Sequence, residues 1–209
     1  MRTAADLRRA ARAAGLDIES IERVPVPGAP GETTLSARMV AKDDDPWAAA
    51  RLLTLLAEED AADPVVRAWS LGILAASSAL NEIPSGPVVT PELRESFGRS
   101  VQRNVQQQIR FVREPRETFQ SARVTMRAKA GDCDDHARLV HALNRAAGAR
   151  SRLLYFVKDG QPVHVAPQVH LGSAGWQWQE TTIPARFGEH PRSAFTRLMR
   201  EGKLPKGAR

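Results

Sequence analysis

Apolar residues in the first half of the chain recur at the three- and four-residue steps of an α-helix. The segment Leu7–Ala14 shows this spacing and stops at Gly15, and a stripe with a step of four runs from Leu93 to Ile109. Alternating apolar and polar residues over Thr33–Val40 predict one short strand. We therefore expect a mostly helical N-terminal part that contains a single strand.

Three helix starts share one feature, a side-chain oxygen placed directly before a proline. The pairs are Asp45-Pro46, Asp63-Pro64 and Thr90-Pro91. The oxygen can accept a hydrogen bond from the first turn, and proline fits the first helical position. The segment Ile83–Pro91 is rich in proline and predicts a loop, so we place the end of the helical N-terminal region, residues 1–85, there.

The second half of the chain predicts a helix followed by an antiparallel meander. After a loop over residues 113–130, Cys133–Ala147 has helical spacing and ends before Gly148. Three strand-like runs separated by glycine-containing turns follow: Leu153–Val157, Val163–Leu171 and Trp176–Thr182. This order indicates an α+β core domain over residues 86–200, with a basic tail over residues 201–209.

Composition and charge narrow the class of protein. The 209 residues are 42% hydrophobic and 26% charged, and no apolar run approaches the roughly 18 residues of a membrane span. The N-terminus lacks the apolar stretch of a signal peptide, so we expect a cytoplasmic protein. The net charge of +6 is spread along the chain without a basic, aromatic-interleaved block. We therefore expect neither a membrane nor a nucleic acid as partner.

The chain has one cysteine, Cys133, which excludes an intrachain disulfide and every multi-cysteine zinc pattern. Two interpretations remain, an inert buried thiol and a nucleophile. Cys133 lies at the predicted start of a helix, where free backbone N–H groups favour the reactive thiolate. The neighbouring Asp132, Asp134 and Asp135 oppose ionisation, so an activated thiol requires a base.

Histidine and carboxylate side chains on the following strands provide a base and its partner. His164 and His170 have the same parity and point to one face of a regular strand. If His170 faces Trp176, Ala166 faces Glu180, and His164 lies diagonally from Glu180, roughly 7–8 Å away. This register requires an odd-length turn or a bulge, which the glycines between the strands permit. The expected arrangement is a nucleophile, a base and a carboxylate that orients the base.

The segment Gly131–Ala137 resembles the G-x-C-x-D-x-A nucleophile helix of the transglutaminase-like superfamily, which has the papain-like cysteine-enzyme fold. The segment His164–Leu171 resembles its histidine strand, and Gly175–Thr182 its G-W-x-x-x-D-x-T strand. The segment Val101–Val112 is similar to the helix before the catalytic loop in bacterial and phage members. The resemblance covers about residues 95–190. Glu180 stands where the family usually has Asp, and Ala166 and Pro167 also depart from its histidine strand.

The resemblance implies a thiol-dependent acyl transfer on an amide bond of a protein or peptide, without a cofactor. It implies Cys133 as nucleophile, His164 as base and Glu180 as the orienting acid; it does not distinguish hydrolysis from crosslinking. We expect the backbone N–H of Cys133 to be one oxyanion donor. The alternative is a catalytically silent member that acts in phage or bacterial assembly. Its helical N-terminal region would bind the partner, and a phage-encoded copy would be virion-associated.

Other polar residues have weaker claims to a role. We expect His170 to be a structural histidine or reserve base, Asp135 a structural hydrogen-bonding residue, and His136 a surface residue. A zinc site built from Cys133, Asp135, His136 and His164 lacks a second matching pair, and we do not adopt it. Glu117, Thr118 and Gln120 precede the nucleophile and either line the cleft or are solvated.

Overall fold

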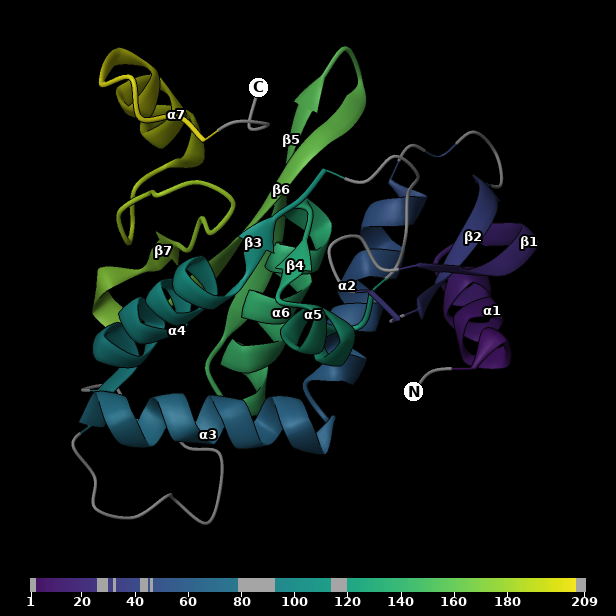
Figure 1. Ribbon diagram of the computed structural model, residues 1–209, viewed down its shortest axis with the longest axis horizontal. Coiled ribbons are helices and arrows are strands. Elements are labelled where there is room, and N and C mark those ends of the chain that lie inside the picture. The colour runs from purple at the N-terminus through teal and green to yellow at the C-terminus, as the bar shows by residue number, and fades with distance from the viewer. Residues whose placement is uncertain are drawn as a thin grey trace.

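The computed structural model describes residues 3–25, 30–31, 33–41, 45, 47–78, 93–113 and 120–205 (Figure 1). No helix in these ranges is long and apolar enough to cross a membrane. The elements are, in chain order, α1 (Ala4–Ala13), β1 (Leu16–Pro25), β2 (Thr33–Ala41), α2 (Ala48–Asp60), α3 (Pro64–Ser78), α4 (Arg94–Gln108), β3 (Arg110–Phe111), α5 (Ala122–Ala128), β4 (Ala130–Gly131), α6 (Cys133–Ala146), β5 (Ser151–Lys158), β6 (Gln161–His170), the 3-10 turn η3 (Gly172–Ala174), β7 (Trp176–Trp178) and α7 (Pro191–Arg200).

The central helix α6 packs between an antiparallel sheet and a layer of helices (Figure 1). Its Leu139, Val140 and Leu143 are fully buried, together with Phe97 and Val101 of α4. The sheet has the order β5-β6-β7 with antiparallel neighbours. The prediction of an α+β fold with a helix packed on an antiparallel meander is therefore confirmed.

The expected strand register is confirmed at its start and wrong at its end. His170 pairs with Trp176 as predicted, across a connection of five residues, 171–175. The third strand ends at Trp178, however, so Glu180 is not opposite Ala166. The N–H of Gln179 donates to the carbonyl oxygen of Pro167 at 3.0 Å, and beyond this bond the chain leaves the sheet.

The N-terminal part contains a β-hairpin where the sequence pattern predicted a single strand. Strand β1 pairs with β2, and the buried Leu7 and Ala11 of α1 pack with it and with Leu52 of α2. Strand β1 was missed because most of its side chains are exposed or half-buried, which leaves little apolar alternation to detect. Helices α2 and α3 pack directly on α6. The proposed boundary at residue 85 lies outside the described residues.

Helix starts and connections differ in detail from the expectations. Asp63 caps α3 as predicted, since its carboxylate accepts from the N–H of Val65 at 2.8 Å. Helix α2 begins at Ala48, two residues after the expected proline, and Thr90-Pro91 lies outside the described residues. The segment 113–130, expected to be a loop, contains α5, which Ser121 caps. Helix α7 was not predicted.

A buried ion pair joins α2 to α6, and we expect its loss to destabilise the fold strongly. Nε of Arg138 donates to the carboxylate of Asp60 at 2.6 Å, and their side chains are 1% and 7% exposed. The same carboxylate accepts from the N–H of Ala122 at 2.8 Å. Asp60→Ala leaves a buried guanidinium without this partner, so the free energy of unfolding should fall by roughly 3–5 kcal/mol in urea denaturation.

The matched control is Glu95→Ala, which removes the carboxylate from an exposed ion pair with Arg99. Those side chains are 55% and 52% exposed, so the expected loss is less than about 1 kcal/mol. Equal losses of unfolding free energy for the two variants would show that the buried Asp60–Arg138 pair stabilises the fold no more than an exposed pair does.

Candidate active site

The thiol of Cys133 is fixed at the first residue of α6 by a capping box. The carboxylate of Asp132 accepts from the N–H of Asp134 at 3.2 Å, and the carboxylate of Asp135 accepts from the N–H of Asp132 at 3.3 Å. A Cβ at Gly131 would lie 2.6 Å from Cβ of Asp135, so only glycine fits before the cap. Cys133 itself is half-buried.

A histidine and a carboxylate converge beside this thiol. Nε2 of His164 on β6 lies 2.7 Å from Oε2 of Glu180, and Cys133 lies close enough to His164 to raise the pKa of its imidazole. The other carboxylate oxygen of Glu180 accepts from the N–H and the hydroxyl of Thr182, both at 2.7 Å. The Glu180 side chain is 1% exposed and that of His164 26%. The three predicted residues are therefore brought together by α6, β6 and the chain beyond β7.

The electrostatics of the group favour a charged imidazole. Burial lowers the pKa of His164, but its hydrogen bonds to Cys133 and Glu180 and the negative charges of both outweigh burial and raise the pKa to about 10. Burial raises the pKa of Glu180, whereas its bonds to His164 and Thr182 and the charge of His164 bring the pKa below its usual value. The arrangement is suited to an imidazolium held by a buried carboxylate.

Aromatic rings cover the His164 imidazole. Phe156 of β5 lies 5.6 Å from the ring of His164 and 5.6 Å from that of Trp178, measured between centroids. His190, next to α7, contacts the edges of both Phe156 and Trp178. This packing limits the positions that the imidazole can take and strengthens its ionic interactions by excluding water.

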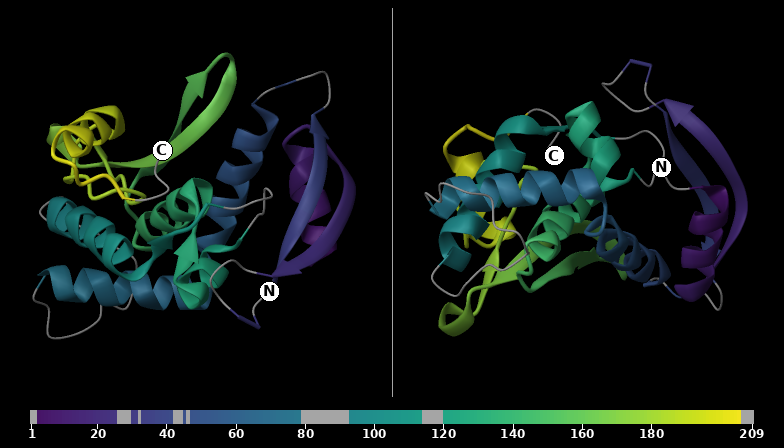
Figure 2. Two further views of the ribbon diagram at one scale, coloured as in Figure 1. Left: turned by 45° about the horizontal axis from the view of Figure 1, so that its top comes forward. Right: turned by 90° about the horizontal axis from the view of Figure 1, so that it is seen from below.

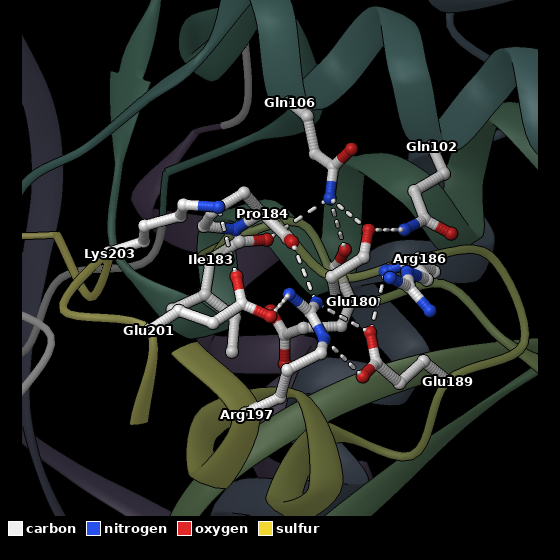
Figure 3. Close-up of polar contacts among 11 residues, drawn as sticks. Gln102, Gln106, Glu180, Ile183, Pro184, Arg186, Glu189, Arg197, Glu201 and Lys203 are labelled. Carbon is white, nitrogen blue, oxygen red and sulfur yellow. Dashed lines mark hydrogen bonds and ion pairs between the residues drawn. The ribbon is translucent and has the colours of Figure 1, made fainter. Parts of the chain in front are cut away.

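The segment that carries Glu180 is positioned by hydrogen bonds from side chains of α4, and not by strand pairing. Nε2 of Gln106 lies 3.0 Å from the carbonyl oxygens of Glu180, Ile183 and Ala185, and Nε2 of Gln102 donates to Ala185 at 2.9 Å (Figure 3). Sequence analysis missed Gln102 and Gln106. The sequence feature that could have indicated them is a pair of amide side chains one helical turn apart, beside the apolar stripe of α4.

The same segment is fastened further along by α7. The guanidinium of Arg197 makes two hydrogen bonds of 2.8 Å to the carboxylate of Glu189, which also accepts from the N–H of Arg186 (Figure 3). Helices on both sides of the segment thus determine where the carboxylate of Glu180 lies.

Two expectations about neighbouring residues are wrong and two are confirmed. His136 was expected on the surface but is 1% exposed, because Thr181 and the ring of Phe111 enclose it. Gln120 was expected at the cleft or in solvent but is fully buried and donates to the carboxylate of Asp135 at 2.6 Å. Asp135 is therefore a structural hydrogen-bonding residue, as predicted. His170 is structural as well: its Nδ1 accepts from the N–H of Gly172.

The alternative zinc set does not come together in the described part of the chain. Within that part, the group of three metal-capable side chains with ligand atoms within 4.8 Å of one another is Asp132, Cys133 and Asp134. Oδ2 of Asp135 and Nδ1 of His136 are engaged in the hydrogen bonds described above. Glu117 and Thr118 lie outside the described residues.

Buried His136 should make the fold sensitive to acid. Burial lowers its pKa to about 4, below the usual 6.5. Since the unfolded chain binds this proton more readily, the stabilising contribution is complete above pH 6.5 and is lost as the pH falls towards 4. We expect a loss of about 3 kcal/mol between pH 7 and pH 4 in denaturant titrations. His136→Gln should remove this part of the pH dependence, whereas the control His170→Gln should retain it; identical profiles for both variants would contradict the assignment.

The fold and the site together define a class. A cysteine at the start of a buried helix, packed on an antiparallel sheet that supplies a histidine, is the arrangement of the papain-like fold. Residues 89–181 match the family described as the transglutaminase-like superfamily. The matched segment contains Cys133, His164 and Glu180.

Two solved structures resemble the chain in outline. One is from Cytophaga hutchinsonii and is described as a "Putative Cysteine Protease"; it has 14% identity, a TM-score of 0.40 and coverage of 80% of this chain and 64% of that chain. The other is described as a TGase, with 14% identity, a TM-score of 0.37 and coverage of 96% and 53%. The chain thus spans less than two thirds of either. No curated protein matches the chain.

Proposed function

We propose that the chain is a cysteine enzyme that transfers the acyl group of an amide, with a protein or peptide as substrate. The observation that supports this most directly is the convergence of Cys133, His164 and Glu180 at the N-terminus of α6, with Nε2 of His164 2.7 Å from the Glu180 carboxylate. Because Nε2 of His164 faces Glu180, the proposed mechanism uses Nδ1 as the ring nitrogen that exchanges a proton with Cys133. The ring therefore lies between carboxylate and sulfur, and Glu180 orients and stabilises the imidazolium.

In the proposed resting site the proton lies on the imidazole, whose pKa is high, and the Cys133 sulfur at the helix N-terminus is the thiolate paired with it. The thiolate attacks the amide carbonyl carbon, and a C–S bond forms. The tetrahedral oxyanion is then stabilised by backbone N–H groups at the start of α6, that of Cys133 among them. The C–N bond breaks as the imidazolium gives its proton to the leaving amine.

The resulting thioester is released by a second nucleophile. A water molecule loses a proton to neutral His164 as it attacks, which frees a carboxylic acid and restores the ion pair. An amine that attacks in the same way forms a new amide and would make the reaction a crosslinking one.

The proposal is tested by measuring the rate of Cys133 alkylation by iodoacetamide against pH, with intact mass spectrometry. Cys133 is the one cysteine of the chain, so the signal has no background. An ion-paired thiol should react at pH 6 nearly as fast as at pH 8. A rate that falls about tenfold for each pH unit below the ordinary thiol value of about 8.5 would contradict the proposal. That result would instead favour the catalytically silent assembly module.

A further inference from the structure

A groove is lined by residues of both the N-terminal part and the core. It has a volume of about 450 Å³, within the roughly 300–1,000 Å³ typical of ligand pockets. We call it the Tyr155 groove; its lining residues are Ala13 of α1, Trp47, Ala50, Arg51, Thr54 and Leu55 at or on α2, and Tyr155 of β5. Figures 1 and 2 show α2 lying between the N-terminal hairpin and the core.

The polar side chains that line the groove already form hydrogen bonds within the protein. The guanidinium of Arg51 donates to the carbonyl oxygen of Ala14 at 2.8 Å and to the carboxylate of Asp45 at 2.6 Å. The hydroxyls of Thr54 and Tyr155 both donate to the carbonyl oxygen of Ala50, at 3.0 and 2.9 Å. The charge of the groove is thus balanced, and the surface it offers to a ligand is apolar.

Large apolar side chains on this surface are unusually exposed. Trp47 is 40% exposed and Leu55 39%, and the ring of Trp47 meets that of Tyr155 edge-on at 6.4 Å. Exposed apolar side chains that gather in a concave site indicate a binding surface, whereas single ones do not. The matching occupant is an uncharged apolar or aromatic group.

Tyr155 places the groove next to the nucleophile. Tyr155 and Cys133 pack against the same buried cluster, which includes Leu53 and Ala57 of α2 and Ala137 of α6. Burial, together with the negative charges of Asp134 and Cys133, raises the pKa of Tyr155, as expected for a ring close to both. The Tyr155 side chain therefore lines the groove and also packs on the cluster that supports the thiol.

We propose that the Tyr155 groove is a specificity subsite that binds a large apolar side chain of the substrate next to the amide that Cys133 attacks. The inference rests on the proposed function and narrows its substrate to peptides with such a residue. Six of the seven lining residues precede residue 89, where the transglutaminase-like segment begins. The subsite is thus a contribution of the N-terminal part to a core that supplies the chemistry.

The test compares two thiol reagents on the full chain, iodoacetamide and N-(2-phenylethyl)iodoacetamide. The ratio of their alkylation rates on Cys133 is divided by the same ratio on glutathione, which removes differences in intrinsic reactivity. We expect a normalised preference of about tenfold or more for the phenylethyl reagent, since a single methylene in an apolar pocket is already worth about 10- to 200-fold. Leu55→Asp and Trp47→Ala should each reduce the preference to about onefold.

The matched control is Val65→Asp, which places a carboxylate on a comparably exposed apolar position, 40% exposed, on α3 and away from the groove. It should retain the wild-type preference, and thermal unfolding identifies any groove variant that fails to fold. Rapid iodoacetamide labelling at pH 6 without a preference, or a preference that survives both groove variants, would overturn the subsite alone. Slow labelling with an ordinary thiol pH profile would overturn the proposed function and the subsite with it.

Discussion

Replacing His164 with alanine is expected to slow iodoacetamide alkylation of Cys133 at pH 6 by roughly 30- to 100-fold. Without the imidazolium, the thiolate loses its counter-charge and hydrogen bond. About 0.3% of an ordinary thiol, which ionises near pH 8.5, is thiolate at pH 6, a loss of roughly 300-fold against a fully ion-paired thiol. The more basic thiolate is also more nucleophilic, which reduces the effect severalfold. Intact mass spectrometry across pH 5–10 measures the change.

His170→Ala is the matched control for this experiment. His170 lies on the same strand, but its Nδ1 accepts from the N–H of Gly172 and its ring packs on Trp176. We expect His170→Ala to retain the wild-type rate at pH 6. A His164→Ala profile that overlays the wild-type profile would remove the evidence for an ion pair, and a loss in His170→Ala equal to that in His164→Ala would show a general effect of altering β6.

Features of the site set by local sequence could be predicted. The start of α6 at Cys133 follows from the Asp132 cap and the apolar spacing that continues to Ala147. The pairing of His170 with Trp176 follows from a short connection that fixes the register of its two strands. In both cases the determining residues lie within about a dozen positions of one another, where periodicity and turn chemistry are informative.

Features set by distant contacts could not be predicted. The carboxylate of Glu180 reaches His164 from beyond the end of β7, and Gln106, 74 positions earlier, holds the backbone at Glu180. The sequence does not distinguish a glutamine on an exposed helix face from a glutamine whose side chain donates hydrogen bonds to a distant loop. The burial of His136 has the same origin, because Thr181 encloses it from 45 positions away. Strand register and the family resemblance both indicated Glu180 as the acid, whereas the contacts that position its carboxylate are visible only in the fold.

Replacing Glu180 with glutamine should lower the pKa of His164 from about 10 by roughly one to three pH units, because an adjacent buried negative charge is lost while the shape is kept. A less stable imidazolium gives a less stable thiolate, so the acid limb of Cys133 alkylation should move to higher pH, with a rate at pH 6 reduced about tenfold or more. NMR titration of the His164 ring and the alkylation profile measure the two effects separately.

Glu58→Gln is the control, since it removes a carboxylate from a second histidine pair outside the site, in which Glu58 lies 3.2 Å from Nε2 of His141. If Glu58→Gln shifts the profile as far as Glu180→Gln, or if neither variant shifts it, Glu180 does not hold the charge of His164 and the proposed triad is reduced to a cysteine and a histidine.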